Sequence, residues 1–139
     1  MRSYLIVANQ TLTGQALADA MAERLADGPI RAHVVVPLTR IGGRLTWDEV
    51  TSREAAQERL DDALERLTTL GADAAGEIGD PDPVSAVRDA MRGREIDEII
   101  VSTLPRGLSR WLGEDVPSRL RDSVRVPVTV VIQPETSTA

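Results

Sequence analysis

One stretch of the sequence has residue types suited to holding a ligand: VSTLPRGLSRWLGEDVPSRL, at residues 101–120. A short apolar run there leads into a loop and then into a helix-like pattern. Loops of this kind often bind anions in α/β proteins, because the free N–H groups and the dipole of the helix start attract negative charge. Three residues oppose this chemistry, since Pro105 has no N–H group to donate and Glu114 and Asp115 would repel a phosphate.

The composition excludes several catalytic chemistries. The 139 residues include no cysteine and no lysine, and the only histidine, His33, lies within an apolar run. Thiol and lysine nucleophiles and a P-loop lysine are therefore absent, no pair of nucleophile and base is visible, and we expect no enzymatic activity. The net charge of −6 disfavours nucleic-acid binding, which requires an excess of basic side chains to neutralise phosphates.

The first ten residues, MRSYLIVANQ, contain an apolar run that is too short for a signal peptide or a membrane span. We expect this run to be a strand, and we expect no membrane partner. The absence of cysteine is compatible with a cytoplasmic location, which is our expectation.

Apolar runs of strand length alternate with helical patterns along the chain. The periodicity predicts strands at 3–8, 30–37, 72–78, 95–103 and 126–132, with helices within 14–28, 52–71, 84–93 and the segment before the last strand. Strict alternation implies one domain, residues 1–134, built as a doubly wound parallel sheet with helices on both faces, followed by a polar tail at 135–139. Ligands bind at the carboxyl ends of strands in such sheets, so the loops after the first and fourth strands are the expected site.

Three segments, in the right order, resemble the universal stress protein family. IGDPDPVSAVRDAM at 78–91 is similar to the exit of that family's third strand, where a Gly-Asp-Pro turn opens a helix. REIDEIIVST at 94–103 is similar to its fourth strand, and LSRWLGEDVPSRLRDSVRVPVTVVI at 108–132 is similar to its last helix and strand. The resemblance implies the strand order 3-2-1-4-5. It also implies a homodimer that pairs through the apolar C-terminal edge strand, and a bare apolar edge invites such pairing.

Many members of this family bind ATP through a loop written Gly-x-x-Gly, nine further residues, and then Gly followed by Ser or Thr. Matching this loop to the chain places Ser102 and Pro105 at the first two glycines, and Glu114 and Asp115 at the final pair. Two carboxylates there would reduce the affinity for a phosphate by about one to three orders of magnitude. The resemblance therefore implies a degenerate nucleotide site, and we assign no cofactor, with ATP or AMP disfavoured.

The resemblance also implies the other candidate ligand-binding residues. The acidic residue that follows the family's first strand corresponds here to Ala8 or Asn9, and Val36 matches a position whose backbone faces the adenine. The complete candidate set is Ala8, Asn9, Val36, Ser102, Thr103, Pro105, Arg106, Gly107, Glu114 and Asp115.

The acidic pair Glu114 and Asp115 has two interpretations. A metal site would need further oxygen ligands from elsewhere in the chain. A helix start needs none, with Asp115 as the cap and Pro117 in the first turn, and we favour it and expect no metal.

The function that we expect is a regulatory or small-molecule-binding module that acts as a homodimer without catalysis. One alternative is a genuine ATP- or AMP-binding protein in which Arg106 and neighbouring amides replace the glycine cradle. A second alternative is a nucleotide hydrolase.

Overall fold

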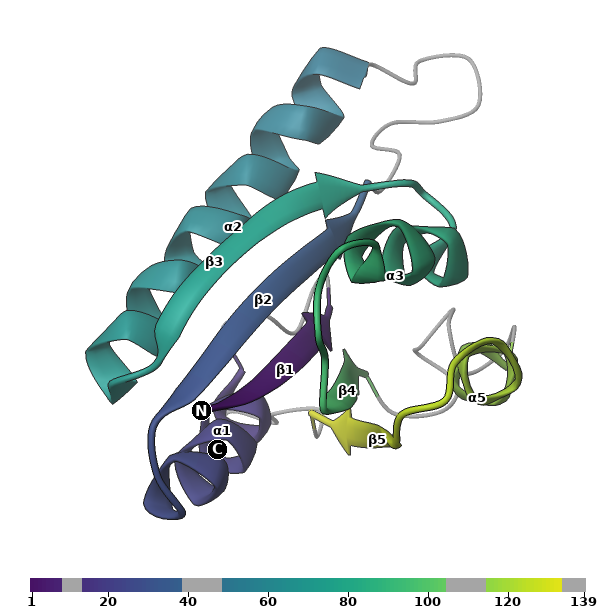
Figure 1. The fold of residues 1–139 in the computed structure, drawn as a ribbon. Coiled ribbons are helices and arrows are strands. Elements are labelled where there is room, and N and C mark those ends of the chain that lie inside the picture. The colour runs from purple at the N-terminus through teal and green to yellow at the C-terminus, as the bar shows by residue number, and fades with distance from the viewer. Residues whose placement is uncertain (9–13, 39–48, 105–114, 134–139) are drawn as a thin grey trace.

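A five-stranded parallel sheet forms the centre of the protein in a computed structural model that describes residues 1–8, 14–38, 49–104 and 115–133. The strand order is β3-β2-β1-β4-β5 (Figure 1), which confirms the predicted fold class and strand order. The elements, in chain order, are β1 (Arg2–Val7), α1 (Gln15–Ala26), β2 (Ile30–Pro37), α2 (Glu49–Leu70), β3 (Asp73–Gly79), α3 (Pro83–Met91), β4 (Glu98–Thr103), α5 (Val116–Ser123) and β5 (Val128–Ile132).

Two strands begin two or three residues later than the sequence predicted, each for a local reason. β4 begins at Glu98 rather than at residue 95, because a side chain replaces a backbone partner just before it. The Asp97 carboxylate accepts a hydrogen bond from the Ser3 N–H group at 2.7 Å, while the Asp97 N–H group donates to the Ser3 carbonyl at 2.8 Å. β5 begins at Val128 rather than at residue 126, because Pro127 has no N–H group and only its carbonyl joins the ladder with β4.

Helices cover both faces of the sheet, because side chains along a strand alternate between its two faces. Tyr4 and Ile6 belong to the core shared with α1 and α2, whereas Leu5 and Val7 belong to the core shared with α3 and α5. In Figure 1, α2 runs along β3 and β2 on one side of the sheet, and α3 and α5 lie on the other. A strand between two apolar layers must be apolar on both faces, which explains the uninterrupted apolar run of β1.

The chain connections diverge between β1 and β4. These strands are neighbours in the sheet, yet the chain leaves β1 toward β2 on one side and leaves β4 toward β5 on the other. Such a topological switch point is where ligands bind in open α/β sheets. The loops that the sequence singled out follow these two strands. Among the residues that the structure describes, no helix is both long enough and apolar enough to cross a membrane.

Candidate functional site

The described part of the candidate site is a row of side chains at the carboxyl ends of the three central strands. The row consists of Val36, Ala8 and Ser102. Each of them directly follows one of three residues that are paired across the sheet: Val35 in β2, Val7 in β1 and Val101 in β4. The Ala8 N–H group donates to the Val35 carbonyl at 3.3 Å, which continues the ladder between β1 and β2. The candidate residues of three separate segments are therefore brought together.

All three side chains of this row face the layer of α1 and α2. Ala8 and Val36 are fully buried in the core on that face, and Ser102 is only 1% exposed. Neither apolar side chain is available to a ligand, so these two residues would present only backbone atoms at the end of the sheet. Ser102 adds a buried hydroxyl group to the end of the row on β4.

Thr103 points toward the opposite face of the sheet. It follows Ser102 in β4, and its side chain is therefore directed toward the layer of α3 and α5. It is 5% exposed, and its carbonyl accepts a hydrogen bond from the Gln133 N–H group at 2.8 Å. The hydroxyl groups of Ser102 and Thr103 are thus separated by the sheet and do not act as a pair.

The turn GDPDP, which opens α3, links this helix to α5. The Asp82 carboxylate accepts hydrogen bonds from the Ser85 N–H group at 3.2 Å and from the Ser85 hydroxyl at 2.9 Å, so Asp82 is the N-cap of α3. Its other oxygen lies 3.3 Å from a guanidinium nitrogen of Arg119 in α5. Partial burial by itself would raise the pKa of Asp82, but the hydrogen bonds from Ser85 and the charge of Arg119 hold that pKa below its usual value.

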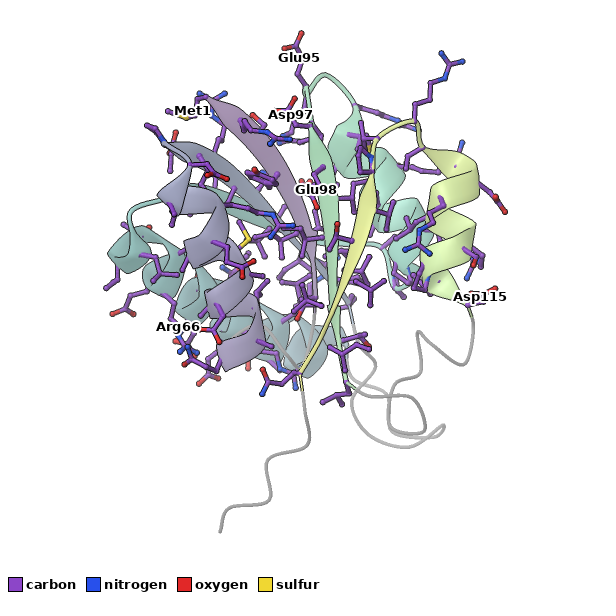
Figure 2. All side chains as sticks on the ribbon, turned by 90° about the horizontal axis from the view of Figure 1, so that it is seen from below. Met1, Arg66, Glu95, Asp97, Glu98 and Asp115 are labelled. Carbon is purple, nitrogen blue, oxygen red and sulfur yellow. The ribbon has the colours of Figure 1, made fainter. Side chains whose placement is uncertain are left out.

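Asp115 occupies the N-cap position of α5, with Pro117 in the first turn, as the helix-start interpretation predicted. Its side chain makes no capping hydrogen bond, so the prediction of a side-chain cap was wrong. The reason is conformational: Asp115 has φ 54° and ψ 41°, whereas a capping side chain requires extended backbone at this position. It is the only non-glycine residue with a positive φ among those that the structure describes, and Figure 2 shows it at the start of α5.

We expect Asp115→Gly to raise the free energy of unfolding by up to about 1 kcal/mol, because glycine adopts the left-handed conformation without the Cβ penalty. Chemical denaturation would measure the change. Asp122→Gly is the matched control. Asp122 lies inside α5, where glycine costs about 1 kcal/mol. Equal destabilisation by both substitutions would contradict the strain that we assign to Asp115.

The candidate residues Asn9, Pro105, Arg106, Gly107 and Glu114 lie outside the described residues. The loop half of the predicted site therefore stays a prediction. Within the described ranges, no group of three or more His, Asp or Glu side chains is arranged to hold a metal ion. His33 is nearly buried on β2, with its Nε2 atom 3.2 Å from the Glu77 carboxylate.

Gln133, directly after β5, was not singled out in the sequence. Its side-chain oxygen accepts a hydrogen bond from the Ala16 N–H group in the first turn of α1 at 2.8 Å. The same side chain fills the space beside Gly14, where an added Cβ atom would lie 2.5 Å from that oxygen. A lone polar residue after an apolar strand carries no sequence signal for a contact with a helix 117 positions away.

A shallow groove of about 360 Å³ lies between α1 and α2. It contains none of the candidate residues. Its lining consists of Gln15, Ala18, Glu65, Arg66, Thr69 and Leu70.

No protein-family model and no curated protein sequence matches this chain. Solved structures do. A member of the universal stress protein family from Burkholderia pseudomallei is 22% identical, with 93% of this chain and 94% of that chain covered and a TM-score of 0.60. A universal stress protein from Archaeoglobus fulgidus is 15% identical, with coverage of 94% and 93% and a TM-score of 0.62.

A third similar structure is the universal stress protein from Archaeoglobus fulgidus in complex with dAMP. It is 19% identical to this chain, with 94% of this chain and 97% of that chain covered and a TM-score of 0.59. The three similarities extend over nearly the whole chain. The chain therefore has the fold of the universal stress protein structures, as the sequence resemblance implied.

Proposed function

We propose that this chain is a universal stress protein-like regulatory module that binds a small molecule without catalysis, at a degenerate nucleotide site, and that acts as a homodimer. The observation that carries this proposal is the row of Val36, Ala8 and Ser102 at the switch point between β1 and β4. In open α/β sheets the ligand lies beside such a row, outside the carboxyl ends of the strands.

The chemistry of the described site residues supports weak binding of phosphates. The resemblance implies that Ala8 or Asn9 stands where the family has an acidic residue. The side chain of Ala8 is a buried methyl group, which forms no hydrogen bond. Asp115 has an exposed carboxylate at the start of α5. In the sequence match to the family's loop, this position corresponds to the hydroxyl residue that binds phosphate. A carboxylate about 4 Å from a phosphate oxygen costs about 1 kcal/mol in water and several times more where water is excluded.

The second candidate function is binding of an adenine nucleotide, and one observation favours it. A solved structure with the same fold was determined in complex with dAMP. In this alternative the backbone at Val36 faces the base, while residues outside the described ranges, Arg106 among them, hold the phosphate.

Titration with adenosine, AMP and ATP separates the two candidates. If Asp115 repels phosphates, saturable binding measured by calorimetry should weaken in the order adenosine, AMP, ATP, by about fivefold for each ~1 kcal/mol of added repulsion. Asp115→Asn should reduce these differences, since asparagine has nearly the same shape, tolerates the left-handed conformation and carries no charge.

Asp122→Asn, at an exposed position about two turns further along α5, is the matched control and should leave the order unchanged. ATP binding as tight as that of adenosine would overturn the degenerate site and establish the nucleotide-binding alternative. Release of phosphate from ATP that disappears in Asp115→Asn would instead establish a hydrolase.

The proposed dimer pairs two copies through the free edge of β5. This strand, VTVVI, contains no charged residue, and Ile132 is 47% exposed. The opposite edge strand, β3, is protected by charge, because Asp73 pairs with Arg31 at 3.6 Å and Glu77 lies 3.2 Å from His33. Of the two edges, β5 is therefore the one suited to pairing with another strand.

We expect Val130→Pro to dissociate the dimer in sedimentation experiments. The Gln133 N–H group points toward β4, because it donates to the Thr103 carbonyl. Backbone N–H groups alternate in direction along a strand, so the Val130 N–H group, three residues earlier, points away from β4. Proline removes this donor and leaves the ladder with β4 intact. Ala74→Pro on the outward side of β3 is the control. A wild-type chain that sediments as a monomer at all concentrations would refute the dimer.

A further inference from the structure

Three side chains join α1 to β4 and β5 near the amino-terminal half of the sheet, and we call them the Glu98 cluster: Arg24, Glu98 and Thr129. The Arg24 guanidinium donates two hydrogen bonds to the Glu98 carboxylate, at 2.8 Å and 3.2 Å. The Thr129 hydroxyl of β5 donates to the same carboxylate. The Arg24 and Glu98 side chains are only 18% and 14% exposed, and Figure 2 shows Glu98 between α1 and β5.

A second contact joins the other end of α1 to the other end of β5. We call it the Gln133 contact; it consists of Gln133, Gly14 and Ala16. The Gln133 oxygen accepts from the Ala16 N–H group at 2.8 Å, and the side chain occupies the space that a Cβ atom at Gly14 would need. The first turn of α1 has no capping side chain of its own, so Gln133 supplies a partner for one of its N–H groups.

These two contacts lie on the same face of the sheet and flank the short strand β5. That strand has five residues, is bonded to β4 along one edge only, and is half-buried over most of its length. An isolated edge strand of this length frays easily, because half of its backbone groups have no partner in the sheet. Attachment to α1 at both ends restricts this motion.

We propose that the Glu98 cluster and the Gln133 contact position β5 for pairing with β5 of a second copy of this chain. The inference rests on the proposed homodimer and assigns positioning residues to it. A strand that is already ordered loses less conformational entropy when it pairs, so the two contacts strengthen association without touching the partner. The second copy is the occupant that this edge fits, because the edge is apolar, uncharged and identical in both chains.

The experiment uses the full chain and the substitutions Thr129→Val and Gln133→Ala, alone and together. Valine has the shape of threonine without the hydroxyl that Glu98 accepts from, and alanine removes the partner of the Ala16 N–H group. We expect the double variant to raise the dimer dissociation constant in sedimentation equilibrium at least tenfold. We also expect hydrogen exchange of the Val131 N–H group, which points toward β4, to accelerate at least tenfold.

Val87→Ala is the matched control. Val87 is fully buried on the opposite face of the sheet, so its truncation lowers stability without affecting either contact with β5. At a temperature where all variants are folded, this control should keep the wild-type dissociation constant. A double variant that associates and exchanges like the wild type, or a control that weakens the dimer equally, would overturn the positioning role.

The outcome in which the wild type is monomeric is distinguishable from failure of the positioning role. Monomeric wild-type chain overturns the proposed pairing and this inference about it. Faster exchange at Val131 in the double variant would then show only that the contacts order β5 within one chain. A dimeric wild type with an unaffected double variant would retain the dimer and reject the positioning role.

Discussion

Replacement of Arg24 by methionine should lower the free energy of unfolding by about 2 to 4 kcal/mol. The substitution leaves the Glu98 carboxylate on a mostly buried face without the guanidinium that donates to it at 2.8 Å and 3.2 Å. A buried charge that loses its partner costs more than the pair itself contributes, because the charge stays desolvated. Denaturation by urea, with the midpoint compared at constant slope, would measure the loss.

Arg31→Met is the matched control for this experiment. Arg31 forms an ion pair with Asp73 at 3.6 Å on the edge of the sheet, where the two side chains are 62% and 66% exposed. An exposed pair of this kind contributes about 0 to 1 kcal/mol. Equal losses in the two variants would show that the Glu98 cluster has no special role in stability.

The pH dependence of the Arg24 effect follows from the pKa of Glu98. Burial by itself would raise this pKa, but the hydrogen bonds from Arg24 and Thr129 hold it below the usual value of a glutamate. The stabilisation is therefore present above the pKa of the unfolded chain, about 4.3, and is lost as the pH falls through the lower pKa of the folded state. The difference between the wild type and Arg24→Met should narrow as the pH falls below about 4. A difference that is constant from pH 7 to pH 3 would contradict this assignment.

Gly76→Val should lower the free energy of unfolding by about 2 to 3 kcal/mol. At Gly76 on β3, a side chain of α2 and the backbone of β2 leave no room for a Cβ atom. A Cβ atom there would lie 2.6 Å from Leu60 Cδ1 and 2.7 Å from the Val34 carbonyl oxygen. The leucine can rotate, but the carbonyl belongs to the backbone of the neighbouring strand, so β2 and β3 would have to separate. Thermal unfolding followed by circular dichroism would measure the loss.

Ala75→Val is the control on the same strand. Ala75 is exposed, so the added methyl groups meet solvent and the change should stay within about 0.5 kcal/mol of the wild type. A Gly76→Val variant as stable as this control would mean that α2 can move away from the sheet without cost.

Local patterns in the sequence were sufficient to predict the fold class. The apolar run at 30–37 coincides with β2, and the spacing of Leu60 and Leu67 marks the face that α2 buries. These predictions succeed because hydrophobic periodicity reports burial within one element, and strict alternation of strands and helices permits few topologies. The strand order came from the resemblance to a known family and agrees with the structure.

The candidate site was predictable in location but not in detail. The sequence placed Ala8, Val36 and Ser102 at the carboxyl end of the sheet, and the structure brings them into one row. The sequence did not indicate that the side chains of Ser102 and Thr103 face opposite helix layers. It also did not indicate that Asp115 adopts the left-handed conformation, because neither property follows from residue type alone.

The contacts that hold the edge of the sheet were decided by tertiary structure alone. Arg24 meets Glu98 across 74 positions of the chain, and Gln133 meets Ala16 across 117. Neither pair has a local signature, because each depends on the register of β4 and β5 and on how α1 crosses them. The pattern of apolar residues determines which face of each element is buried, whereas the polar pairs form only after those faces have packed and brought distant side chains within hydrogen-bonding distance.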